Sequence, residues 1–269
     1  ALLGGVCSPI SLLANDGDWP MFGGSPDRNF VNTREKNIPG TWDVDSGENI
    51  RWAVDLGTKA YGGPTVAGGR VFVGTNNQNP RDPSILGDKG VMMCFDEATG
   101  DFQWQLVFDK LPAGRVQDWP EEGICSSASV DGDRLYFVSN RCTIVCADVQ
   151  GDSANPGKGK IHWQYDMIGE DQVFPHNLAV CSPLVVGDLL FVVTANGVDE
   201  EHVNIPSPEA PSFLCIRKSD GAFMWKSNLP TKSLVEAKQQ GGAVSVVDLI
   251  NQGKLAMHGQ WSNPTYAEP

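Results

Sequence analysis

The stretch CFDEATGDFQW (residues 94–104) places a glycine turn between two apolar runs and ends on a tryptophan. The same pattern returns in CADVQGDSANPGKGKIHW (146–163) and in CIRKSDGAFMW (215–225). In each copy a cysteine opens a strand, a turn with glycine follows, and a tryptophan lies four residues after a glycine: Gly100 and Trp104, Gly159 and Trp163, Gly221 and Trp225. A pattern that recurs in this order indicates an internal repeat rather than a single hairpin.

A second shared element precedes each copy. The stretches GGPTVAGGRVFVGTN (62–76), SSASVDGDRLYFVSN (126–140) and CSPLVVGDLLFVVTA (181–195) each place a Gly or Gly/Asp turn between two apolar runs. This pattern is typical of a β-hairpin. Two hairpins per copy give four strands, and a four-stranded repeat of about 60 residues predicts a propeller blade.

The sequence therefore predicts an all-β fold, a β-propeller of four-stranded antiparallel blades with about three complete blades, partial ones and an incomplete ring. The alternative is an ordinary β-sandwich whose strands look alike. Two separate elements recur in the same order and register, which favours the propeller. Helical content is predicted to be slight, with one helix expected around SLVEAKQQ (233–240).

The motif of the first copy resembles the tryptophan-docking motif of the PQQ-type (pyrroloquinoline-quinone-type) β-propeller repeat. Cys94, Asp96, Thr99, Gly100 and Trp104 match it in full. In that family the tryptophan of the outer strand packs against the turn of a neighbouring blade. The resemblance implies that these tryptophans join one sheet to the next.

The other two copies depart from the motif. The second keeps the aspartate, glycine and tryptophan but lengthens the turn: Asp148, Gly159 and Trp163. The third has Arg217 in place of the aspartate and Asp220 in place of the threonine, and it retains Gly221 and Trp225. The polar contacts of docking are therefore least certain in the third copy.

Four further stretches resemble a subgroup of secreted PQQ-like propeller proteins of planctomycete-type bacteria. They are residues 18–30, 111–127, 174–184 and 258–264. The resemblance spans nearly the whole chain, and it identifies architecture better than chemistry.

The repeats divide the chain into an arm and blades. Residues 1–15 are small and apolar, which predicts a truncated signal peptide and a periplasmic or extracellular location; the alternative is a disordered or strand-forming arm. Residues 16–60 are expected to form an N-terminal arm with a ring-closing strand. The PQQ-like blades are expected at 61–110, 124–168 and 180–230, with a partial blade at 255–269. Because closed propellers have four to eight blades, we expect an N-terminal fragment whose remaining blades lie in a longer chain.

Charge and residue spacing exclude some classes of partner and site. The net charge is −13 and no cluster of Lys and Arg is present, so nucleic acid is not an expected partner. No apolar run approaches the ~18 residues of a membrane span. No metal-ligand spacing is present, and no metal site is assigned.

Seven cysteines occur without a Cys-x-x-Cys motif. Three share one repeat position, which favours buried thiols that act as small hydrophobes: Cys94, Cys146 and Cys215. In an oxidising compartment a pair could instead form among the remaining candidates, Cys125, Cys142 and Cys181. The adjacent cysteine pair of some PQQ-dependent alcohol dehydrogenases is absent, which counts against that activity.

Propeller geometry gathers two kinds of loop on one face: those entering each innermost strand and those joining the second and third strands. We call this the loop face. Its candidate binding residues are Trp119, Asn140, Arg141, His176, Asp199, His202, His258 and Trp261. The three histidines, near carboxylates, could bind a cation or assist proton transfer. The alternative is that they make structural hydrogen bonds.

Two functions remain open. The first is an exported, non-catalytic binding or scaffold module that holds a protein or small-molecule ligand on the loop face. The second, implied by the resemblance, is a quinoprotein oxidoreductase that uses PQQ and calcium to oxidise alcohols or sugars. No nucleophile-base pattern is present, and no catalytic residue is assigned.

Overall fold

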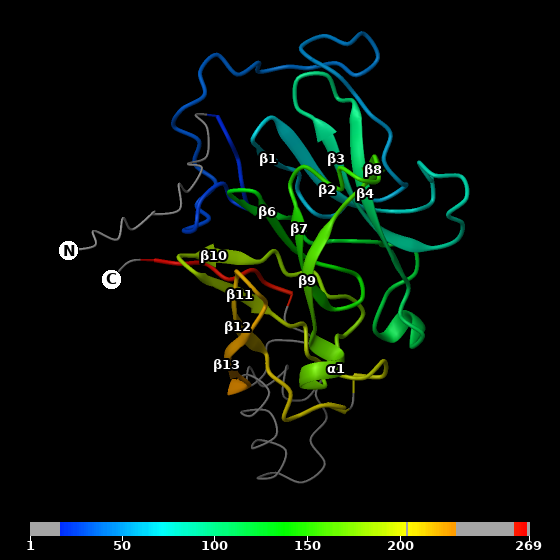
Figure 1. Cartoon of the computed structure of the whole chain (residues 1–269), viewed down its shortest axis with the longest axis vertical. Helices are drawn as coiled ribbons and strands as arrows, with labels where there is room; N and C mark the ends of the chain where they lie inside the picture. The colour runs from blue at the N-terminus through cyan, green and yellow to red at the C-terminus, as the bar shows by residue number, and fades with distance from the viewer. Residues whose placement is uncertain (1–16, 203, 230–260, 268–269) are drawn as a thin grey trace, which may run out of the picture.

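The computed structural model describes residues 17–202, 204–229 and 261–267, and its strands form three sheets (Figure 1). The first sheet contains β1 (Thr65–Ala67), β2 (Arg70–Asn76), β3 (Lys89–Asp96) and β4 (Phe102–Asp109). The second contains β5 (Ser129–Asp131), β6 (Arg134–Val138), β7 (Thr143–Asp148) and β9 (Ile161–Asp166). The third contains β10 (Leu184–Val186), β11 (Leu189–Val193), β12 (Phe213–Arg217) and β13 (Phe223–Ser227).

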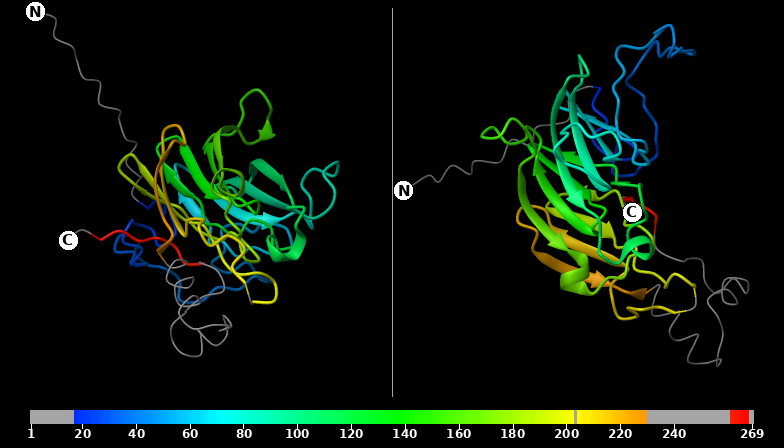
Figure 2. Two further views of the ribbon diagram at one scale, coloured as in Figure 1. Left: turned by 90° about the horizontal axis from the view of Figure 1, so that it is seen from below. Right: turned by 90° about the vertical axis from the view of Figure 1, so that its right-hand side faces the viewer.

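Within each sheet the strands follow chain order, and each pairs antiparallel with the next. Figure 2 shows the three sheets side by side in the order of the sequence. The prediction of an all-β, incomplete propeller built from four-stranded antiparallel blades is confirmed.

The lengthened turn of the second repeat adds a strand to its neighbour. β8 (Gly157–Lys158) pairs in parallel with β4 and gives the first sheet a fifth strand. Two short helical segments were not predicted: η1 (Gly114–Val116) and α1 (Met167–Asp171). The side chain of Asp166 caps α1 by accepting a hydrogen bond from Ile168 N. The helix predicted at 233–240 lies outside the described residues.

The repeated cysteines lie opposite the repeated tryptophans. Cys94 pairs with Trp104, Cys146 with Trp163, and Cys215 with Trp225. In all three sheets the register shifts immediately after the cysteine, which marks a β-bulge. A small side chain thus faces each large ring at the point where the outer strand bends.

The six described cysteines are buried free thiols. The alternative of a bond among Cys125, Cys142 and Cys181 is therefore not formed in this structure. Cys181 Sγ instead accepts a hydrogen bond from Val193 N at 3.2 Å. Burial raises the pKa of Cys94 to about 12, so this group stays a protonated thiol.

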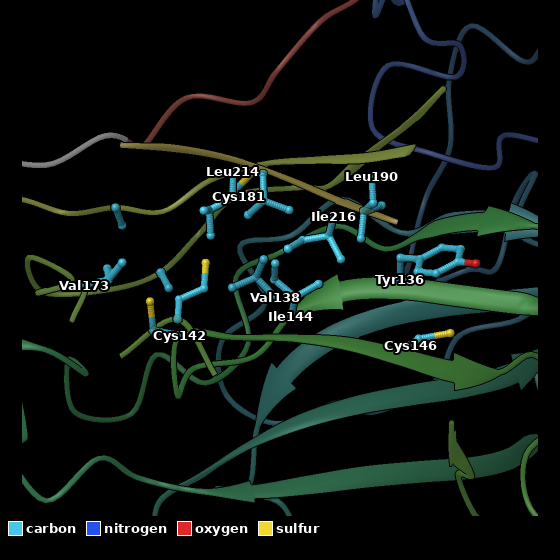
Figure 3. Packing of buried hydrophobic residues seen from close by; sticks show 14 of the residues in the cluster. Tyr136, Val138, Cys142, Ile144, Cys146, Val173, Cys181, Leu190, Leu214 and Ile216 are labelled. Carbon is cyan, nitrogen blue, oxygen red and sulfur yellow. The ribbon is translucent and has the colours of Figure 1, made fainter. Parts of the chain in front are cut away.

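Apolar side chains fill the space between adjacent sheets. One cluster joins the first and second sheets, with Phe72 and Trp104 packed against Phe137 and Val149. A second cluster, shown in Figure 3, packs Tyr136, Ile144 and Cys142 against Leu190, Leu214 and Ile216. The hydrophobic cores thus lie between blades and hold neighbouring blades together.

The N-terminal arm contacts all three sheets. Trp19 forms a bridge with Val66 on β1, and Val130 N on β5 donates to Pro20 O at 2.7 Å. The buried guanidinium of Arg28 donates from one nitrogen to Ser182 O and Pro183 O, at 2.9 and 2.8 Å. These residues precede β10, so the arm fastens the three inner strands to one another.

A ladder of hydrogen bonds passes between equivalent positions of successive repeats. Ser127 N donates to Ser182 Oγ at 3.0 Å, and Ser182 N donates to Asn263 Oδ1 at 2.5 Å. Asn263 thus occupies the position that Ser182 has in the third repeat. In the part of the chain that the structure describes, no helix is long and apolar enough to cross a membrane.

Candidate functional site

Of the three predicted docking tryptophans, Trp104 and Trp163 contact the next repeat, whereas Trp225 is 42% exposed and packs on Phe191 and Phe213 of its own sheet. Trp104 is 1% exposed, and its Nε1 donates to Val149 O at 3.1 Å. The ring lies against Gly151, where φ is +80° and a Cβ would come within 2.5 Å of the indole. Both the left-handed backbone and the lack of space require glycine at this position.

The same contact occurs at two other junctions. Trp163 Nε1 donates to Lys218 O at 3.1 Å and its ring lies against Gly221. Trp52 Nε1 donates to Glu97 O at 2.8 Å and its ring lies against Gly100. Trp52 lies in residues 49–56, whose outer-strand pattern predicts the ring-closing strand; the structure assigns no strand to these residues, yet Trp52 makes the contact expected of an outer-strand tryptophan.

The structure corrects the place of Gly159. The turn of the second repeat closes at Gly151, whose N–H donates to Asp148 O at 3.2 Å. Gly159 comes after the inserted segment, and its N–H donates to Gln105 O at 2.9 Å. A Cβ there would meet Leu106 and Trp104, so Gly159 lines the tryptophan site without forming its turn. Its distance in sequence from Trp163 equals that of the other pairs only because of the insertion.

Polar groups organise each docking turn. Asp96 Oδ1 accepts from Ala98 N at 2.9 Å and from Thr99 N at 3.0 Å, and these hydrogen bonds lower the pKa of Asp96. Asp148 Oδ1 accepts from Gln150 N at 2.8 Å. In the third repeat Arg217 Nη2 instead pairs with Asp220 at 2.8 Å. The altered third motif thus keeps a closed turn by an ion pair.

On the loop face, Asp118 is a buried hub between loops. It accepts from Asn140 Nδ2 at 2.8 Å and from Leu111 N at 2.9 Å, and it pairs with Lys110 Nζ. Burial raises the pKa of Asp118, although its hydrogen bonds act in the opposite direction. Arg141 Nη1 donates to Lys110 O at 3.2 Å. Asn140 and Arg141 are thus held in fixed positions by buried partners.

Trp119 lies beside this hub. The backbone N–H of Trp119 donates to Asn177 O at 2.8 Å, and the backbone N–H of Asn177 donates to Val116 O at 2.7 Å. The Arg115 guanidinium lies 4.2 Å from the Trp119 ring and pairs with Glu200 at 3.3 Å. Three loops therefore meet around one half-buried indole.

The histidine pair joins two loops: His176 immediately precedes Asn177, and His202 lies in the loop that follows β11. His176 is buried, its Nδ1 lies 2.9 Å from Val198 O, and its Nε2 lies 3.1 Å from His202 Nε2. Trp261 stacks on His176 with ring centroids 5.9 Å apart, and its Nε1 donates to His176 O at 3.2 Å. Asp199 O accepts from His202 N at 3.1 Å, which turns His202 toward His176.

The structure thus places seven of the predicted loop-face residues in two linked groups. Trp119, Asn140 and Arg141 surround Asp118, while His176, His202, Asp199 and Trp261 form the second group. His258 lies outside the described residues. Among the residues described, no three His, Cys, Asp or Glu side chains converge as a metal centre would need. Sequence reasoning missed Lys110 and Asp118, since only the fold shows that this charged pair is buried.

The family model described as "Outer membrane protein assembly factor BamB" matches residues 17–116. No curated protein matches the chain.

Three solved structures align with it in part. A quinohemoprotein alcohol dehydrogenase from Comamonas testosteroni shares 12% identity at a TM-score of 0.46, over 77% of this chain and 26% of its own. BamB from Moraxella catarrhalis shares 19% sequence identity at a TM-score of 0.38, over 62% of this chain and 38% of its own. A europium-containing methanol dehydrogenase shares 15% sequence identity at a TM-score of 0.47, over 77% of this chain and 31% of its own. The alignments span well under half the length of each of these structures.

The matched residues contain the arm, Trp52 and strands β1 to β4 of the first sheet, and four-stranded antiparallel order recurs in the second and third sheets. Residues 17–116 thus match the PQQ-like β-propeller repeat family, and the fold of the later sheets is consistent with it.

Proposed function

We propose that the chain is a non-catalytic binding module of an exported protein, and that it holds another protein on the loop face. The contact surface is centred on Trp119 and Trp261. Arg115 and Glu200 form its polar part.

One observation carries this proposal. Trp119 and Trp261 come from separate loops, yet both are anchored to consecutive carbonyls of a third loop: the backbone N–H of Trp119 donates to Asn177 O, and the indole Nε1 of Trp261 donates to His176 O. The Trp261 ring is thus held by its own hydrogen bond, and the Trp119 ring packs under the Arg115 guanidinium at 4.2 Å. A surface arranged in advance loses less side-chain freedom on binding.

The residue types also suit protein recognition. Trp261 is 46% exposed, and Arg115 lies over the half-buried Trp119. Tryptophan and arginine are enriched among residues that dominate binding energy at protein interfaces. The family description of an outer membrane assembly factor agrees with an exported protein that binds other proteins. The expected signal segment, residues 1–15, lies outside the described residues.

The test is partner capture from the cell envelope, followed by affinity measurement with the purified partner. The double variant Trp119→Ala with Trp261→Ala should weaken binding by at least tenfold and leave thermal stability nearly unchanged. Trp42→Ala is the matched control, because Trp42 is 69% exposed on the N-terminal arm. Equal affinity in the double variant and the control would contradict the proposal.

The same protein can be tested for the quinoprotein alternative. Asn140 Nδ2 and the Arg141 guanidinium, two of the loop-face candidates, already donate to groups of the chain. Quinone absorbance that survives desalting after incubation with PQQ and Ca²⁺, together with dye reduction by alcohols, would replace the binding proposal by the enzyme.

A further inference from the structure

We propose that a cavity beside the outer strand of the first sheet binds a small organic carboxylate that has an apolar body and an N–H or O–H donor. The cavity has a volume of about 430 Å³. Cavities that bind small molecules are commonly of this size, and they combine an apolar lining with a few polar groups that orient the ligand. The proposal uses none of the residues of the protein contact proposed above.

Two segments outside the four-strand pattern form walls of this cavity. One is the loop between β2 and β3, which contributes Arg81, Asp82 and Ile85. The other is the inserted segment of the second repeat, which contributes residues 156–159. The third repeat closes its docking turn within residues 217–221 and has no such insertion. Docking of a tryptophan therefore does not require the inserted segment.

Strand β4 forms a further wall, and it places one unsatisfied polar group there. Phe102, Leu106 and Val107 provide apolar surface, and Gln105 lies among them. Gln105 is 8% exposed, and in the described part of the chain its Oε1 is buried without a hydrogen-bond partner. Buried polar atoms are nearly always hydrogen-bonded. The last torsion of a glutamine is broad, so this oxygen can turn to accept a hydrogen bond from an N–H or O–H of a ligand.

The charged side chains around the cavity favour an anion. Arg81 and Lys158 are positive and Asp82 is negative, so the lining has one positive charge in excess. Asp82 Oδ1 already accepts from Ser84 N at 2.9 Å and from Ser84 Oγ at 2.6 Å. Among the described residues, no carboxylate forms an ion pair with Arg81 or Lys158. A ligand carboxylate would supply the missing negative charge.

The backbone and the aromatic rings hold these groups in place. Arg81 Nη2 donates to Asp55 O, and the guanidinium lies 5.3 Å from the centroid of Phe95 and 5.4 Å from that of Phe102. A guanidinium has five N–H donors, so others remain for a ligand.

Lys158 and Gln105 are neighbours across two strands. They are paired in register where β8 runs parallel to β4. Side chains of paired residues point to the same side of a sheet. One ligand can therefore reach Lys158 with its carboxylate and Gln105 with its donor.

The probe is N-acetyl-L-leucine, because it combines a carboxylate, an apolar side chain and one N–H donor. Binding to the whole chain is followed by saturation-transfer NMR and by calorimetry, and we expect one saturable site. Two matched probes each lack one feature: N-acetyl-L-leucinamide lacks the charge, and 4-methylpentanoate lacks the N–H. Both should bind at least about fivefold more weakly.

Two variants test the assigned groups. Lys158→Gln and Gln105→Leu should each weaken binding of N-acetyl-L-leucine by at least about fivefold. Gln105→Leu should keep at least the native melting temperature, because it replaces an unsatisfied buried polar group by an apolar one of similar size. The matched control is Lys160→Gln, an exposed lysine of the same segment outside the cavity lining, which should bind the probe like the native chain.

Four results would overturn the proposal. One is binding of N-acetyl-L-leucine that never saturates, and another is equal affinity for either matched probe. The third is native affinity in Lys158→Gln or Gln105→Leu, since a variant that binds the probe normally has a folded site. The fourth is an equal loss of affinity in Lys160→Gln, which would show a general effect of surface charge.

Discussion

Replacement of Trp104 by alanine should destabilise the propeller far more than replacement of the equivalent Trp225. Trp104 is 1% exposed, contacts Gly151 of the next repeat, and donates to Val149 O. Trp225 is 42% exposed and packs on Phe191 and Phe213 of its own sheet. The two variants remove the same atoms from the same position of the repeat.

The magnitude follows from burial. Loss of a fully buried tryptophan side chain costs about 3–5 kcal/mol of unfolding free energy. The unpaired Val149 carbonyl adds about 1 kcal/mol. Trp225→Ala removes a ring that is little more than half buried, so it should cost about 2 kcal/mol. The variants should therefore differ by at least about 2 kcal/mol.

Urea unfolding followed by circular dichroism and by fluorescence measures this difference, and coincident curves justify a single free energy. Trp104→Phe serves as an intermediate, because it keeps an aromatic ring and loses the N–H donor. Equal losses in Trp104→Ala and Trp225→Ala would refute the docking account, since burial between blades would then contribute nothing.

Two further predictions concern the turns and the loop-face hub. Gly221→Ala should lower the free energy of unfolding by at least about 1 kcal/mol more than Gly132→Ala does. Both glycines have positive φ, but a Cβ at position 221 would lie 2.7 Å from Trp163, whereas a Cβ at position 132 would meet open space. Urea unfolding midpoints of the two variants measure the difference. Asp118→Asn should change the pH dependence of stability. Because burial raises the folded pKa of Asp118 above 3.8, the native state binds a proton more readily than the unfolded chain, and stability from this group rises as pH falls through the raised pKa. The stability deficit of Asp118→Asn should therefore grow between neutral and acid pH, and a deficit that shrinks would contradict the assignment.

The sequence could predict the blades because the repeat is local. The strand pairs, turn and tryptophan of one repeat are close together in sequence, so the repeat can be recognised from the amino-acid sequence alone. The stretch around Trp52 also shows the outer-strand pattern, but it has no hairpins of its own, so the sequence could not show which turn Trp52 contacts. The prediction that Gly159 forms the docking turn was wrong, because the inserted segment happens to place a glycine four residues before Trp163. The backbone shows that Gly151, with a φ of 80°, is the glycine of the turn.

The loop face could be predicted only in part. Propeller topology predicts that Trp119, His176 and His202 lie on one face. The contacts that hold them depend on loops meeting in space, which single-sequence patterns do not encode. The ion pair between buried Asp118 and half-buried Lys110 is such a contact, as is the hydrogen bond from the Trp119 backbone N–H to Asn177 O.

The most direct test of the central claim, that Trp104 docks on the glycine turn of the next repeat as Trp163 does, is a double-mutant cycle between Trp104 and Gly151. In the native background Gly151→Ala forces a Cβ to within 2.5 Å of the indole, whereas in Trp104→Ala the ring is gone. We therefore predict that Gly151→Ala costs at least about 1 kcal/mol less in the Trp104→Ala background. An equal cost of Gly151→Ala in both backgrounds would show that the two residues do not interact, and it would contradict the account.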